Sequence, residues 1–286
     1  MPSIFDLVDA SYKTDVALAS FKKLDPNAPR DYRELAVILA NYWRQHDHKV
    51  IGLSGGQGAG KSTLSRLIET ASLHLGEHVI VLGLDEFYLT RNERERLANE
   101  KHALFATRGP PGTHDVSRLL DAIDGLVAGR SVEIPQFDKG VDDRSGTRRI
   151  DPPCHRVLIE GWCVGANPQP EYMLTEPLNT LELKHDSDRT WRHAVNGYLT
   201  ETYAELHDRL NSLVYLRVPD IDSVTRWRLQ QEEDRAPEQR RDIEWISQFV
   251  QHYQRITEWM YDDVAGRADV LVELDANHRV VATTLR

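Results

Sequence analysis

The 286 residues of the chain are 40% hydrophobic and 28% charged, with a net charge of -10, a balance typical of a globular enzyme with one large core or two small ones. The acidic balance argues against broad binding of nucleic-acid phosphates, although it is compatible with a locally basic cleft. No apolar run approaches the ~20 residues that cross a bilayer, and the N-terminus lacks a secretory signal. The two isolated cysteines are too few for a disulfide framework or a zinc site. We therefore expect a cytoplasmic protein that binds neither nucleic acid nor membranes.

The first part of the chain, residues 1–47, is predicted to be helical. Four apolar side chains recur there at helical spacing, namely Leu35, Ile38, Leu39 and Tyr42. The segment 25–29 contains two prolines and interrupts the pattern. We interpret residues 1–47 as an N-terminal helical extension, a layer added to a main domain that covers residues 48–286.

The segment 55–62 reads Gly-Gly-Gln-Gly-Ala-Gly-Lys-Ser and has the form of a phosphate-binding loop, G-x-x-x-x-G-K-[ST]. A predicted strand at 50–54 precedes it and a predicted helix from about 61 to 75 follows it, a context that favours this function over an ordinary glycine-rich turn. Backbone N–H groups and the helix dipole would face the phosphates, Lys61 would reach the β- and γ-phosphates, and the Ser62 hydroxyl would ligate Mg²⁺. The predicted nucleotide-binding residues are Gly55, Gly56, Gln57, Gly58, Ala59, Gly60, Lys61, Ser62 and Thr63.

The rest of the chain alternates between apolar strand-like runs and helical patterns. Strands are predicted at 78–84, 131–135, 156–160, 213–218 and 270–274. Helices are predicted at 91–102 (an exposed helix or lid), 115–128, 188–211, 220–233 and 238–262. Asp115 would cap the second of these, whose buried face would comprise Val116, Leu119, Leu120, Ile123 and Val127. This alternation predicts an α/β fold of the P-loop NTPase type, with a mostly parallel sheet and helices on both faces.

Two acidic residues follow predicted buried strands, and ligands of such sheets bind at the carboxyl ends of the strands. Asp85 is predicted to act as the base for an acceptor hydroxyl, as a metal ligand, or as both; the alternative is a turn cap. Glu160 is predicted to hold Mg²⁺, directly or through water, opposite Ser62, although a glutamate at a strand end is common without a function. The neighbouring Glu86 is interpreted as a solvated residue.

Several residues between the two acidic positions suit recognition of a polar acceptor. Arg108 offers a bidentate fork for a carboxylate or phosphate, and it shares a proline-rich loop with His114. The alternative is that this loop only shapes a connection. The predicted substrate-binding residues are Tyr88, Arg108, His114, Asp138 and Lys139. The segments 137–139 and 143–144 either line the same cleft or form a charged, solvated loop.

An arginine near the C-terminal half is a candidate for neutralising charge on the transferring phosphate. Arg226 and Arg228 flank Trp227 on a predicted helix, and Arg228 is the predicted catalytic residue. The alternative is a solvated helix face with Trp227 buried. The remaining tryptophans considered, Trp162, Trp191 and Trp245, are predicted to belong to the core.

Taken together, the motifs resemble those of plant-type D-glycerate 3-kinase and its fungal and bacterial relatives, within the group of phosphoribulokinase, uridine kinase and pantothenate kinase. The tracts that carry the resemblance are Gly-Gln-Gly-x-Gly-Lys-Ser, Leu-Asp-x-Phe-Tyr-Leu-Thr (84–90), Thr-Arg-Gly-x-x-Gly-Thr-His-Asp (107–115), Ile-Pro-Gln-Phe-Asp-Lys (134–139), Ile-Glu-Gly-Trp-Cys-Val-Gly-Ala (159–166) and Trp-Arg-Leu-Gln-Gln-Glu (227–232). The resemblance runs from about residue 48 to 262 and leaves the first 47 residues unmatched. One departure is Gly56, where many relatives carry proline or alanine.

The resemblance implies a P-loop kinase that uses ATP and Mg²⁺ to phosphorylate a small hydroxylated acceptor, D-glycerate at its 3-hydroxyl. Lys61 and Ser62 match the phosphate and metal positions, and Asp85 matches the catalytic base. Glu160 matches the second acidic position. The predicted catalytic residues are Asp85, Lys61, Arg108 and Arg228, and the predicted metal ligands are Ser62, Asp85 and Glu160. A nucleoside or other metabolite kinase is the alternative enzyme, and an ATP-dependent switch or assembly factor acting on a protein partner is the alternative from another class.

Overall fold

The computed structural model describes residues 4, 14–233 and 240–286 and is built around a six-stranded sheet. The strands lie in the order β2 (Val79–Gly83), β5 (Arg156–Gly161), β1 (Val50–Gly55), β6 (Ser212–Arg217), β7 (Val270–Leu274) and β8 (Val280–Leu285). All neighbours pair in parallel except β7 and β8, which are antiparallel. The central strands β1 and β6 are almost wholly buried, which explains their continuous apolar sequences. The predicted α/β class with a mostly parallel sheet is confirmed.

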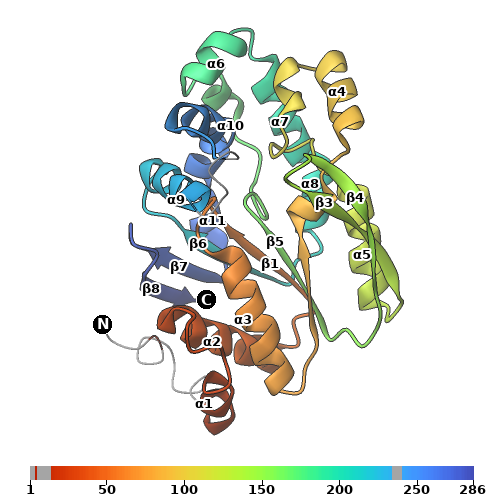
Figure 1. Ribbon diagram of the computed structural model, residues 1–286, viewed down its shortest axis with the longest axis vertical. Helices are drawn as coiled ribbons and strands as arrows, with labels where there is room; N and C mark the ends of the chain where they lie inside the picture. The colour runs from red at the N-terminus through yellow and green to blue at the C-terminus, as the bar shows by residue number, and fades with distance from the viewer. Residues whose placement is uncertain (1–3, 5–13, 234–239) are drawn as a thin grey trace.

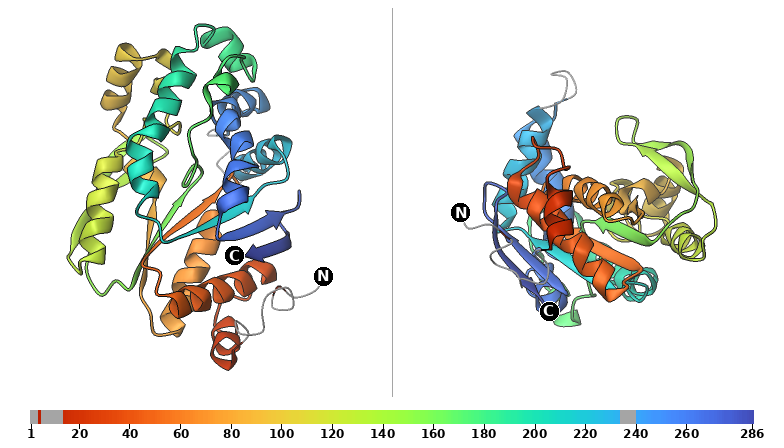
Figure 2. Two further views of the ribbon diagram at one scale, coloured as in Figure 1. Left: turned by 180° about the vertical axis from the view of Figure 1, so that it is seen from behind. Right: turned by 90° about the horizontal axis from the view of Figure 1, so that it is seen from below.

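Helices cover both faces of the sheet, as Figures 1 and 2 show from opposite sides. One face carries α2 (Arg30–His46), α3 (Lys61–His74) and α9 (Ile221–Glu233), whose apolar residues form one core cluster with β1 and β6. The other face carries a second cluster from α5 (Val116–Val127), α7 (Thr190–Thr200), α8 (Thr202–His207) and α11 (Asp263–Arg267). Helix α10 (Ile243–Met260) contributes to both clusters. The described helices therefore enclose the parallel strands from two sides.

Helix α2 is buried more completely than its sequence pattern suggests. All residues from Leu35 to Trp43 are buried, rather than one apolar stripe. The sheet and α3 lie on its inner side, and α1 (Asp15–Phe21) packs on it as well. The Trp43 indole donates to Ser212 Oγ at the start of β6. The helical character predicted for this region is confirmed for α1 and α2, and the domain boundary between residues 47 and 48 stays a prediction.

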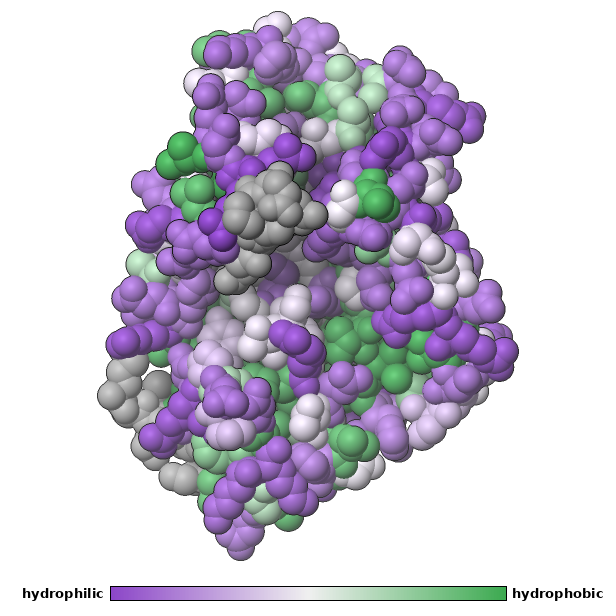
Figure 3. All heavy atoms as spheres, viewed as in Figure 1, coloured by the Kyte–Doolittle hydropathy of each residue, from purple (hydrophilic) through white to green (hydrophobic). Residues whose placement is uncertain are grey.

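A two-stranded antiparallel hairpin, β3 (Val132–Asp138) and β4 (Asp143–Ile150), forms an arm outside the main sheet (Figure 1). The strand predicted at 131–135 continues to residue 138. The second strand of the arm was not predicted, because β4 has little alternation between apolar and polar residues. Figure 3 shows apolar surface in the hollow between α3 and this arm, where Ile80, Val81 and Phe137 lie.

Other elements correct the sequence-based predictions in detail. The helix predicted at 188–211 is two helices, α7 and α8, because the backbone leaves the helical region at Glu201. On α5, Val127 is 51% exposed and Leu126 is fully buried in its place. Edge strand β8 was not predicted. The shorter helices are α4 (Arg91–Glu100), α6 (Thr180–His185), η3 (Leu84–Phe87), η4 (Ala103–Ala106) and η5 (Glu171–Leu174). The two predicted residues 238 and 239 of the last helix lie outside the described residues.

None of the helices that the structure describes combines the length and the apolar character that a membrane span requires.

Candidate active site

The loop between β1 and α3 folds as the glycine pattern predicts. Gly58 and Gly60 have φ angles of 80° and 78°, values that favour glycine. A Cβ atom on Gly58 would lie 2.7 Å from Trp227 Cβ, so the position has no room for a side chain. Helix α3 begins at Lys61, whose ammonium group donates to the carbonyl oxygens of Gly55 and Gly56 at 2.8 and 3.0 Å. The lysine therefore lies over the concave side of the loop.

Ser62 and Glu160 meet at the carboxyl ends of β1 and β5. Strand pairing places Glu160 beside Leu53 of β1 and Gly83 of β2. The Ser62 hydroxyl donates to the Glu160 carboxylate at 2.9 Å. Burial raises the pKa of Glu160, and the charge of Lys61 opposes this shift. The predicted opposition of Ser62 and Glu160 is thus found as a direct contact.

Asp85 lies on the short helix η3 immediately after β2. Its carboxylate accepts a hydrogen bond from the Tyr88 hydroxyl at 2.8 Å and forms an ion pair with Lys139 at 2.6 Å. Burial by itself would raise the pKa of Asp85, but the charge and hydrogen bond of Lys139 together with Tyr88 lower it to about 2. Asp85 is therefore a carboxylate at neutral pH. Its neighbour Glu86 is not simply solvated as predicted, because it accepts from Arg148 at 3.1 Å and from the Gly83 N–H at 3.0 Å.

A cleft of about 370 Å³ joins these groups. The predicted site residues that line it are Gln57, Gly58, Lys61, Ser62, Asp85, Tyr88, Arg108, Lys139, Glu160 and Arg228. Its charged lining residues are four cations and two carboxylates, so the cleft is locally basic in a protein of net charge -10. Such a local excess of positive charge concentrates anions.

Arg108 reaches the cleft from the loop that precedes α5. Its guanidinium pairs with Asp142 in the turn of the β3–β4 arm, and it lies 5.7 Å from the centre of the Phe137 ring. The Arg108 carbonyl accepts from the Tyr253 hydroxyl at 2.8 Å, and the next carbonyl, of Gly109, accepts from the Trp162 indole at 3.0 Å. Two aromatic side chains thus hold the backbone that carries Arg108.

Two predicted substrate-binding residues, His114 and Asp138, are not among the lining residues of this cleft. His114 is buried behind Tyr88, stacked on its ring with centroids 4.6 Å apart, and its ring nitrogen contacts the Tyr203 hydroxyl. Burial lowers the pKa of His114 to about 4. Asp138 accepts from the Gly140 N–H at 2.7 Å and thereby shapes the turn of the arm. Both are placed to support neighbouring site residues rather than to contact a substrate in the cleft.

Arg228 lines the cleft from α9. It pairs with Glu232 at 2.9 Å, one helical turn further along. Trp227 is buried as its alternative interpretation predicted, and Trp191 is also buried. Trp245 is 38% exposed and stacks on Phe249, so its prediction as a core residue was wrong.

The sequence analysis did not identify Gln231, Phe249 and Tyr253, which line the cleft from α9 and α10, and it interpreted Trp162 only as a core residue. Phe249 and Tyr253 are one turn apart on α10, a spacing equally typical of a buried helix face. The signal in the sequence was the glycine at position 109. In the structure, a Cβ atom at this position would lie 1.9 Å from the Tyr253 hydroxyl. A glycine of this kind indicates a close neighbour but does not say which residue it is.

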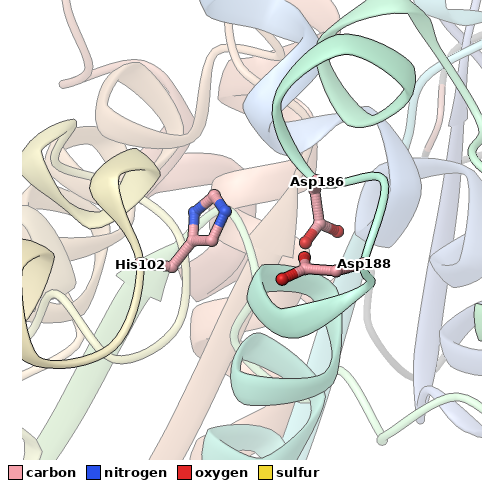
Figure 4. A group of neighbouring side chains, drawn as sticks. All are labelled: His102, Asp186 and Asp188. Atoms are coloured by element: carbon pink, nitrogen blue, oxygen red, sulfur yellow. The ribbon is translucent and has the colours of Figure 1, made fainter.

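A second cluster of potential metal ligands consists of His102, Asp186 and Asp188 (Figure 4). None of the three lines the cleft. Asp186 is fully buried, pairs with Arg192 at 2.8 Å and accepts from the Trp191 N–H at 2.7 Å. Asp188 accepts from the Thr190 hydroxyl at 2.8 Å. These carboxylates therefore bind the backbone and side chains at the start of α7, and we assign no ion to the cluster.

Comparison with models of known protein families gave no match. Over 219 residues, however, the chain is 35% identical to a protein of Schizosaccharomyces pombe named uncharacterized kinase mug58, an alignment that covers 71% of this chain and 78% of that protein. The chain belongs to the same kinase family. A further relative is the chloroplastic D-glycerate 3-kinase of Arabidopsis thaliana, 27% identical over 196 residues, which are 64% of this chain but only 41% of the plant enzyme.

Solved structures confirm the fold of the family. The protein YGR205w matches with a TM-score of 0.73 at 25% identity, over 89% of this chain and 98% of that one. The D-glycerate 3-kinase of Cryptococcus neoformans also matches with a TM-score of 0.73, over 98% and 100% of the two chains, and at 22% identity it supports the fold alone. The predicted family and P-loop kinase fold are confirmed, and the chain is a kinase.

Proposed function

We propose that this kinase transfers the γ-phosphate of ATP, with Mg²⁺, to the 3-hydroxyl of D-glycerate. The observation that carries the proposal is the single cleft that the Asp85 carboxylate shares with Lys61, Ser62, Arg108 and Lys139. This reaction needs groups that bind the phosphates, an acidic residue near the acceptor hydroxyl, and cations that bind an acidic acceptor.

On the nucleotide side, we assign the backbone of residues 55–63 and the Lys61 ammonium group to the phosphates of ATP. Ser62 and Glu160 touch through oxygen atoms, and Asp85 lines the same cleft. A set of hydroxyl and carboxylate oxygens fits Mg²⁺, so we propose these three residues as its protein ligands. When bound, the ion would supply positive charge to balance that of the phosphates.

Asp85 is proposed to orient the acceptor hydroxyl and to accept its proton. Its pKa of about 2 keeps it ionised, so it is ready to accept a hydrogen bond at neutral pH. The same low pKa makes it a weak base, which places the proton transfer late in the reaction. Phosphoryl transfer with a loose transition state depends mainly on positioning and charge stabilisation, and we propose that Arg228 contributes such charge from α9.

The charge of the cleft favours D-glycerate over a nucleoside. Arg108, Lys139 and Tyr88 all line the cleft, and we assign them to the acceptor, because a guanidinium binds a carboxylate through two parallel hydrogen bonds. A neutral nucleoside would offer these two cations no carboxylate beyond their present partners, Asp142 for Arg108 and Asp85 for Lys139. The name of the Arabidopsis thaliana relative points to the same acceptor. We assign His114 and Asp138 to the support of Tyr88 and of the turn that carries Lys139.

The test is an acceptor screen with purified protein, saturating ATP and Mg²⁺. D-glycerate should give ADP and 3-phosphoglycerate, identified by phosphorus NMR, at a higher kcat/KM than L-glycerate, sugars and nucleosides. Preference for a nucleoside would contradict the acceptor assignment. ATP hydrolysis that needs no acceptor and increases only with a protein partner would instead support a switch. Cytoplasmic location stays a prediction, to be checked by imaging the tagged protein.

A further inference from the structure

The outer side of the phosphate-binding loop is held by residues from three separate elements. Tyr32 comes from the first turn of α2, Trp227 from α9 and His278 from the turn between β7 and β8. His278 contacts the Gly58 carbonyl through a ring nitrogen at 3.0 Å and stacks on Trp227 with ring centroids 4.0 Å apart. Most of this support comes from the main domain, but Tyr32 belongs to the helical region ahead of it.

Tyr32 contacts the loop through both its ring and its hydroxyl. The side chain is 3% exposed, and its hydroxyl donates to the Ala59 carbonyl at 2.7 Å. A Cβ atom on Gly60 would lie 2.8 Å from the Tyr32 ring, so the ring lies directly against this glycine. Burial, with the nearby charge of Asp31, raises the pKa of Tyr32. The hydroxyl therefore keeps its proton and remains a donor throughout the physiological pH range.

This hydrogen bond fixes the direction of one peptide group in the loop. In a planar trans peptide the C=O and N–H bonds point in opposite directions. When the Ala59 carbonyl points outward to Tyr32, the N–H of Gly60 must point to the opposite, concave side. The Lys61 ammonium group, which donates to the Gly55 and Gly56 carbonyls, lines the cleft from the same loop. Backbone N–H groups on the concave side are the donors for phosphate oxygens.

The position of Tyr32 is itself fixed by the start of α2. Asp31 accepts from the Tyr32 N–H at 3.0 Å and, through its other oxygen, from the Val280 N–H of β8 at 2.9 Å. The body of α2 is buried against the sheet and α3. The first turn of α2 is thus tied to a strand of the main sheet, and Tyr32 transmits that fixed position to the loop.

We propose that Tyr32 is a positioning residue for the nucleotide, and that α2 is a working part of the kinase site rather than a layer outside it. By holding the Ala59–Gly60 peptide, Tyr32 presents the Gly60 N–H to a phosphate group before ATP arrives. The entropic cost of ordering this peptide then arises when the protein folds and not when ATP binds. The inference rests on the nucleotide half of the proposed function.

The test compares Tyr32→Phe with Tyr261→Phe by calorimetric titration with ADP and Mg²⁺. Tyr32→Phe keeps the ring against Gly60 and removes only the hydroxyl. Tyr261 is a matched control, because its hydroxyl is buried without a hydrogen-bond partner among the described residues. One net hydrogen bond corresponds to about a fivefold change in affinity, so Tyr32→Phe should raise the Kd for ADP about fivefold. The KM for the acceptor should not change, and Tyr261→Phe should bind ADP like the wild type.

A second measurement is hydrogen–deuterium exchange of the unliganded proteins. The peptide that covers residues 55–62 should exchange faster in Tyr32→Phe, while α5 on the opposite face of the sheet should not change. Unaltered ADP affinity in Tyr32→Phe, in a protein that exchanges like the wild type, would overturn the positioning role and leave the kinase assignment intact. A wild-type protein that does not bind ADP would overturn both.

Discussion

The two sides of the cleft are built in different ways. The proposed nucleotide side comes from one continuous segment, β1, its loop and α3, with Glu160 on the neighbouring strand. The proposed acceptor side comes from separate pieces: Asp85 on η3, Tyr88 just after it, the loop with Arg108, and the arm with Lys139. The phosphate-binding segment is specified mainly by one stretch of sequence, with Tyr32 as an outside support. The residues proposed for the acceptor are instead held by ion pairs between distant segments, Arg108 with Asp142 and Lys139 with Asp85. We therefore expect substitutions among the proposed acceptor residues to change the choice of acceptor, and substitutions in the phosphate-binding segment to change nucleotide binding.

The largest effect is expected where the two sides meet, at Asp85. Asp85→Asn keeps the size of the side chain but removes the charge, so kcat should fall by about 10²- to 10⁴-fold. The Kd for ATP should change little, because the loop and Lys61 are unaltered. The matched control is Glu86→Gln, since Glu86 pairs with Arg148 and does not line the cleft. A similar loss of kcat in both variants, measured in steady-state assays, would show that Asp85 has no special role.

A smaller effect, confined to the acceptor side, is expected at Arg108. Arg108→Gln removes a charged hydrogen-bond donor worth about 1.5–3 kcal/mol, so the KM for D-glycerate should rise by about 10- to 100-fold while the KM for ATP stays nearly constant. Arg149→Gln is the control, because Arg149 is exposed on the arm and pairs with Asp151. Equal increases in both KM values would contradict the division of the cleft into two sides.

The smallest expected effect is a shift in pH dependence at Lys139. Lys139, together with His114 and Tyr88, lowers the pKa of Asp85 to about 2 against the effect of burial, and Lys139 makes the largest of these contributions. Because this pKa is depressed in the folded protein, the ion pair stabilises the fold above the ordinary value of 3.8 and loses its contribution as the pH falls through about 2. Lys139→Gln should therefore raise the pKa of Asp85 and move the acidic limb of the kcat/KM profile to higher pH. Lys184→Gln, at an exposed site on α6, should leave the profile in place.

The sequence alone predicted the fold of the phosphate-binding loop and most strands of the sheet. The phosphate-binding loop depends on glycine dihedral angles and on the adjoining strand and helix, which are local properties of the chain. Asp85 and Glu160 were found because the carboxyl ends of parallel strands share one edge of a sheet. The continuous apolar runs of β1, β5 and β6 likewise predicted that these strands are buried.

The tertiary structure decided what no local pattern encodes. It brought Phe249 and Tyr253 of α10 to the cleft, turned His114 behind Tyr88, and paired Arg108 with Asp142 across the arm. It also placed Tyr32 against a loop that lies 27 residues further along the chain. These contacts join segments that are far apart in sequence, and their geometry depends on how whole helices pack on the sheet, which the order of residues within any one segment does not specify.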